Sequence, residues 1–146
     1  MFGFFGKKAK AAKANLHKVE NRDLMEAIVA GSIMVAFADG ECEDSELQNL
    51  EKLIAANENL KHFGSEINTT IGRFMQMFEA GPRMGKMKAM RELDDIKASP
   101  EEIEEAFVMM IEIAEADGQI EPEELAILKE VGQKLGVRLS DFGLAA

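Results

Sequence analysis

The chain of 146 residues is poor in cysteine, proline and the larger aromatic side chains. It contains one cysteine and three prolines, and it has neither tryptophan nor tyrosine. A single cysteine excludes an internal disulfide and fits a reducing compartment. The scarcity of proline, with abundant Leu, Met, Ala, Glu and Lys, favours helix over strand. The composition therefore predicts one all-α domain, large enough to form a core without disulfides or bound metal.

Long apolar runs are also missing. No stretch approaches the roughly 20 apolar residues that a membrane-spanning helix needs. At the N-terminus the lysines follow a very short apolar patch, which is the wrong order for a secretory signal peptide. We therefore expect a cytoplasmic protein, and we consider peripheral attachment to the inner membrane.

The net charge of −10 is unevenly distributed. Residues 1–22 contain six basic residues and one acidic residue, a net +5, so residues 23–146 carry −15. We divide the chain accordingly into a basic, phenylalanine-containing segment, 1–22, and a helical domain, 23–146. The acidic domain disfavours nucleic acid as a partner, whereas the basic segment could contact an anionic membrane or fold back onto the domain.

Apolar residues recur at helical spacing along most of the domain. The expected helices cover about residues 23–37, 47–54, 67–78, 84–96, 100–114 and 122–135, and the total with the chain ends is about seven. Gly81 and Pro82 should separate two of them, because glycine closes a helix and proline cannot continue one. We interpret Met84, Met87 and Met90 as the core face of their helix rather than as soft-metal ligands.

One short motif occurs twice, 78 positions apart. Each copy places an Asp-Gly pair after an apolar helical run and an acidic helix start after the pair: Asp39-Gly40 with Glu46, and Asp117-Gly118 with Glu124. This pattern predicts a helix–turn–helix elbow, with glycine at positive φ. The repeat units, about 24–56 and 103–136, should superimpose and form a pseudo-two-fold bundle.

The spacing also matches the second half of a calcium-binding EF-hand loop. The first half is absent, since apolar Val35 and Ile113 stand where acidic ligands would be required. Two interpretations of the elbow acids stay open. They could bind calcium or magnesium, which folding would not require, or they could cap the following helices. The candidate metal ligands are Asp39, Glu43, Glu46, Asp117, Glu121 and Glu124.

The remaining reactive side chains carry no catalytic pattern. His17 and His62 have no neighbouring cysteine, and Cys42 has no adjacent histidine or lysine to activate it. Neither a serine triad nor a phosphate-binding glycine loop is present. We therefore do not expect an enzyme.

Taken together, these features resemble the TerB family of tellurite-resistance proteins. The resemblance covers the Phe- and Lys-rich start at 1–8, the Ala-Asp-Gly elbows at 38–40 and 116–118, the stretch 58–63 and the ending 135–144. It implies a cytoplasmic all-α bundle with internal pseudo-two-fold symmetry and acidic elbows. It also implies association with other Ter proteins, including TerD-like calcium binders and a TerC-like membrane protein.

The resemblance leads to one principal expectation for function. The chain would be a non-enzymatic scaffold, or an interaction module that responds to divalent metal, in tellurite resistance and stress response. The alternative is an adaptor at the membrane surface, directed there by its basic N-terminal segment without control by metal. In this chain Cys42 is found only in the first elbow and Pro122 only in the second, so the two elbows could differ in how strongly they bind metal.

Overall fold

The computed structural model describes residues 21–116 and 118–144 of the chain. Within them it contains six α-helices and two short 3₁₀ helices, so the expected all-α class is confirmed and the count of about seven is slightly high. After a first helix, residues 21–36, come α2 (Asp44–Ala56), η1 (Lys61–Phe63), α3 (Ser65–Ala80), α4 (Pro82–Asp94), α5 (Pro100–Ala114), α6 (Pro122–Leu135) and η2 (Leu139–Phe142). The basic segment lies outside the described residues, except for Asn21 and Arg22.

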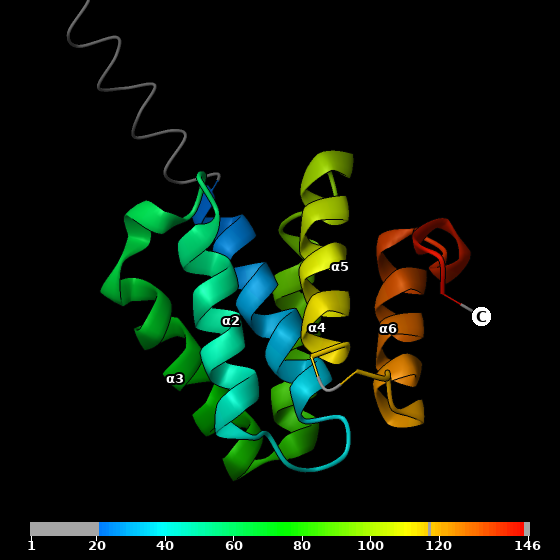
Figure 1. Ribbon diagram of the computed structural model, residues 1–146, viewed down its shortest axis with the longest axis horizontal. Coiled ribbons are helices and arrows are strands. Elements are labelled where there is room, and N and C mark those ends of the chain that lie inside the picture. The colour runs from blue at the N-terminus through cyan, green and yellow to red at the C-terminus, as the bar shows by residue number, and fades with distance from the viewer. Residues whose placement is uncertain (1–20, 117, 145–146) are drawn as a thin grey trace, which may run out of the picture.

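The first helix forms the centre of the bundle. Residues 27–36 are buried on every side, as expected for a helix that is apolar all round. Figure 1 shows this helix in blue behind α2 and α5, with α3 on one side of the bundle and α6 on the other. A Cβ atom added at Gly31 would lie only 2.7 Å from Sδ of Met110, so this glycine lets α5 approach the central helix closely.

The helix ends follow local sequence signals. Ser99 caps α5, since its Oγ accepts a hydrogen bond from the N–H of Glu102 at 3.3 Å. Gly136 ends α6 in the left-handed conformation, with φ of 77°. Gly81 and Pro82 separate α3 from α4 as predicted.

The prediction that methionines form the core face of α4 is wrong for Met84 and Met87, whereas Met90 is partly buried and packs against the core. Met84 is 55% exposed and Met87 is 38% exposed, whereas the buried face consists of Gly85, Ala89 and Leu93. A Cβ atom added at Gly85 would lie 2.8 Å from Cγ of Phe78, which shows how closely α4 packs on α3. Small residues four positions apart permit this approach, and Met84 and Met87 lie outside it.

Candidate functional site

The first elbow is a tight turn at the end of the central helix. The N–H of Gly40 donates to the carbonyl of Phe37 at 2.8 Å, and the φ of Gly40 is 97°. The Oδ1 atom of Asp39 accepts a hydrogen bond from the N–H of Glu41 at 3.1 Å, so this carboxylate supports the turn. The predicted positive φ of Gly40 is confirmed, and its cause is that glycine has no Cβ atom to clash.

The second elbow has the same backbone pattern 78 positions later. The N–H of Gly118 donates to the carbonyl of Glu115 at 2.8 Å, and its φ is 99°. The N–H of Ala116 donates to the carbonyl of Ile113, as that of Ala38 does to Val35 in the first elbow. The predicted φ of Gly118 is therefore confirmed. Asp117 lies outside the described residues, and superposition of the two complete units stays a prediction.

Both elbows lead into a helix that begins with a capping box. Glu43 is the N-cap of α2, and Oε1 of Glu46 accepts a hydrogen bond from the N–H of Glu43 at 3.4 Å. Glu121 is the N-cap of α6, and Oε1 of Glu124 accepts from its N–H at 2.8 Å. In each box the N-cap side chain accepts in return from the backbone of the third helical residue. The capping role considered for Glu46 and Glu124 is thus confirmed.

The metal-binding interpretation of these acids stays a prediction. Over residues 21–116 and 118–144, no group of three or more His, Cys, Asp and Glu side chains is arranged to hold a metal ion. Asp39, Glu43 and Glu46 of the first elbow are among these residues and do not form such a group, whereas the second elbow cannot be judged on that ground, because Asp117 is not among them. The oxygen-rich donor set of both elbows would suit calcium or magnesium rather than zinc.

The pKa of Cys42 is affected by the negative charges that lie close together at the first elbow. Burial raises the pKa of its thiol, and the neighbouring carboxylates of Glu46, Asp39, Asp44 and Glu79 raise it further, to about 12. Sequence reasoning did not include Glu79, which reaches the elbow from the last turn of α3. No local signal could have identified it, because only the packing of α3 brings this residue to a thiol 37 positions earlier in the chain.

Three carboxylates of the first elbow form no salt bridge within the part of the chain that the structure describes. Among the ion pairs of the described residues, none includes Asp39, Glu43 or Asp44. These three carboxylates are exposed, whereas Glu46 is buried beside them. The first elbow is therefore a negatively charged surface, which attracts positively charged groups.

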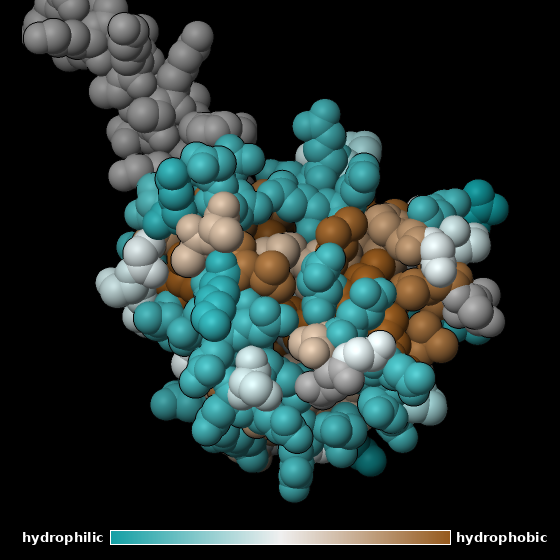
Figure 2. Space-filling model, in the orientation of Figure 1, coloured by the Kyte–Doolittle hydropathy of each residue, from teal (hydrophilic) through white to brown (hydrophobic). Residues whose placement is uncertain are grey.

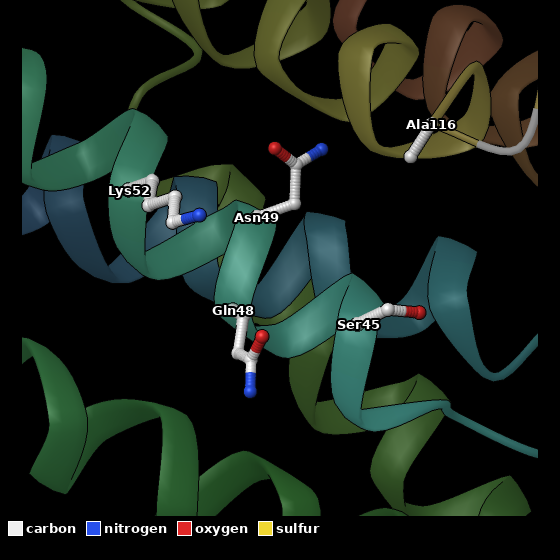
Figure 3. Close-up of a pocket in the computed structure, with 5 residues that line it drawn as sticks. All are labelled: Ser45, Gln48, Asn49, Lys52 and Ala116. Carbon is white, nitrogen blue, oxygen red and sulfur yellow. The ribbon is translucent and has the colours of Figure 1, made fainter.

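The two elbows lie at the same end of the bundle, as Figure 1 shows in cyan and in yellow to orange. An open cleft of about 320 Å³ lies between the start of α2 and the second elbow, lined by Ser45, Gln48, Asn49, Lys52 and Ala116. Figure 3 shows the four polar side chains along α2 and Ala116 just beyond the end of α5. Packing of α2 against α5 thus brings the acidic helix starts to one polar face.

The fold and the paired elbows define a class of all-helical domains with two acidic turns at one end, each followed by a capped helix. In the described part of the chain, no helix is long and apolar enough to cross a membrane. The model of the family "Tellurite resistance protein TerB" matches residues 25–146. Because this match covers most of the chain, the protein belongs to the TerB family, as its sequence suggested. Comparison with curated proteins and with solved structures found no match.

Proposed function

We propose that this chain acts in tellurite resistance as a non-enzymatic interaction module whose acidic elbow end binds a positively charged group. A divalent cation, calcium or magnesium, is the first candidate, and its binding would control association with other Ter proteins. Membership of the TerB family supports the general association with tellurite resistance. The observation that carries the rest is the set of carboxylates around Cys42: burial raises the pKa of that thiol, and Glu46, Asp39, Asp44 and Glu79 raise it further, to about 12.

The shape of the elbow end supports binding rather than catalysis. Its cleft is open and polar, and the polar side chains on its α2 side are amides, a hydroxyl and a lysine. None of these is a nucleophile paired with a base. An open face at one end of a bundle suits contact with another protein, and a cation held at its edge would alter the charge that this partner meets.

Calorimetric titration of the full chain with calcium and then with magnesium tests the proposal. In one variant, Asp39→Asn with Glu46→Gln, the first elbow loses two of its negative charges but keeps the hydrogen-bond acceptors, because Asn still supports the turn and Gln still serves in a capping box. A second variant, Asp117→Asn with Glu124→Gln, does the same for the other elbow. We expect weaker binding in each variant, with an unchanged helical circular dichroism spectrum.

The matched control is Asp141→Asn, which removes one exposed carboxylate from the turn after α6, where it pairs with Arg138. Its titration should equal that of the unaltered chain. Titrations that show no heat with either cation, or that do not change in the elbow variants, would reject divalent metal as the ligand.

Alkylation of Cys42 gives an independent measurement on the same protein. It is the only cysteine of the chain, so every alkylated thiol reports the first elbow. A cation bound among the carboxylates would favour the thiolate and therefore speed alkylation. An equal rate with and without calcium, in a sample that binds calcium by calorimetry, would place the ion away from the first elbow.

A further inference from the structure

The outward face of α5 combines exposed apolar surface with carboxylates. Val108 is 40% exposed, one of three large apolar side chains exposed among the described residues. It borders a mostly apolar hollow of about 310 Å³, whose other lining residues are Glu101, Glu104, Glu105 and Met109. Figure 2 shows apolar residues gathered between polar ones on the side of the molecule where α5 and α6 lie. Such a surface suits a ligand that carries both apolar groups and positive charges.

The first 20 residues of this chain have that composition. They contain Phe2, Phe4 and Phe5, followed by five lysines and a single acidic residue, Glu20. Phenylalanine side chains would fill an apolar hollow of this size, and lysines four or five positions away would meet the glutamates around it.

The segment is followed in the chain by Asn21, which the structure places close to the hollow. Asn21 is buried, and its Nδ2 atom donates a hydrogen bond to the carbonyl of Asn59 at 3.1 Å. Two residues earlier, the side chain of Asn57 donates to Oε1 of Glu105, which lines the hollow. The 57–59 turn thus connects the point where the segment enters the domain with the acidic hollow on α5.

The linker is long enough for this contact. Residues 6–20 separate the phenylalanines from Asn21, and 15 residues span up to roughly 50 Å when extended. Since the segment and the hollow belong to one chain, the effective concentration of the segment at the hollow is high, and docking has a low entropic cost.

The other candidate surfaces fit this segment less well. The exposed Met84 and Met87 of α4 lie among the basic residues Arg83 and Lys88, which would repel the lysines. The acidic elbows lie at the opposite end of the central helix, whose 16 residues are about 24 Å long. The elbows also lack an exposed large apolar side chain.

We propose that the N-terminal segment of this chain docks on the hollow of α5, with its phenylalanines against Val108 and its lysines beside Glu101 and Glu104. In this state the apolar side chains of the segment are covered. The segment becomes available to another surface only when it is displaced, so α5 regulates access to it. This inference is independent of cation binding at the elbows, which use other residues at the other end of the bundle.

Paramagnetic relaxation in the full chain tests the contact. A nitroxide is attached through Ala9→Cys in a Cys42→Ser background, and amide signals of the isotopically labelled protein are compared before and after reduction of the nitroxide. We expect selective loss of the signals of residues 101–109. The loss should disappear in Glu101→Lys with Glu104→Lys, and it should persist in the matched control Glu51→Lys with Glu123→Lys, which makes the same change of charge on α2 and α6.

A second variant leaves the α5 surface unchanged and alters only the N-terminal segment. Replacing Phe2, Phe4 and Phe5 by Ser should also abolish the signal loss, even if the charge reversals on α5 impair folding. Equal loss over the whole domain, or loss centred on the elbows, would overturn the proposal. A further experiment adds nitroxide-bearing protein without isotope label to isotopically labelled protein without nitroxide. Loss of the signals of residues 101–109 in that mixture would also overturn the proposal, because the occupant would then be a second copy.

Discussion

The ionisation of Cys42 gives a quantitative test of the electrostatics at the first elbow. The pKa of this thiol rises from an ordinary value of 9.0 to about 12 in the folded protein. Only the thiolate reacts with an alkylating reagent, and each pH unit changes its population tenfold well below the pKa. A thiolate of higher pKa is also the stronger nucleophile, with a Brønsted coefficient of roughly 0.4–0.5. At pH 8 folded Cys42 should therefore react roughly 30- to 60-fold more slowly than the same thiol in the unfolded chain.

The substitution Asp39→Asn isolates the electrostatic part of this effect. Burial contributes most to the rise in pKa, Glu46 comes second, and Asp39 is third of five contributions that all raise it. The substitution should therefore lower the pKa of Cys42 and speed alkylation, and its effect should be smaller than that of Glu46→Gln.

The assay measures the alkylation rate of the full chain with iodoacetamide from pH 7 to 10, in native buffer and in denaturant. The variant Asp141→Asn serves as control, because this residue does not contribute to the shift of Cys42. The reasoning would be refuted if the alkylation rate of the folded protein had its midpoint near pH 9. It would also be refuted if the Asp39→Asn variant reacted at the same rate as the unaltered chain.

The same shift predicts how stability depends on pH. The folded state disfavours the thiolate, so the contribution of Cys42 is complete below the unfolded-state pKa of about 9 and is lost as the pH rises toward 12. The free energy of unfolding should therefore fall more steeply above pH 9 in the unaltered chain than in Cys42→Ser. Parallel denaturant titrations of the two proteins between pH 8 and 10 measure this difference, and identical slopes would contradict the prediction.

Four further predictions concern stability and are measured by denaturant unfolding. Gly118→Val should cost more than ~1 kcal/mol because φ is 99°, whereas Gly72→Ala inside α3, where an added Cβ meets nothing within 4 Å, should stabilise by about 0.5–1 kcal/mol. Ser99→Ala should cost about 1 kcal/mol by removing the cap of α5, and an unchanged midpoint would reject that role. Asp94, whose pKa is lowered first by its hydrogen bond to Lys134, should contribute ~0.2–1 kcal/mol above pH 4 and lose this as the pH falls through its folded-state pKa. The free energies of unfolding of Asp94→Asn and of the unaltered chain should therefore become equal at acidic pH.

Local features of the sequence were enough to predict the elbows and most helix ends. Gly40 and Gly118 have the positive φ that an Asp-Gly turn after an apolar helix requires. Pro122 begins α6, as proline in a first turn should, and Ser99 caps α5. Each of these signals acts through a backbone conformation or a hydrogen bond within about four residues, so it can be interpreted without knowledge of the fold.

The prediction for α4 failed because periodicity does not determine which apolar stripe faces the core. Its methionines and its small residues both recur at helical spacing. The close approach of Phe78 made Gly85 and Ala89 the buried face and left Met84 exposed. That choice depends on how well the surfaces of α3 and α4 fit together, which is a property of the pair of helices.

By itself, then, the sequence determined the helical class, the positions of both acidic elbows and the family of the protein. Only the tertiary structure decided that Glu79 adds its charge to the field at Cys42, that the elbows share one end of the bundle, and that the hollow on α5 lies close to Asn21. The reason is physical. A turn or a cap depends on a few neighbouring residues, whereas the meeting of distant side chains depends on many weak packing contacts summed over the whole chain.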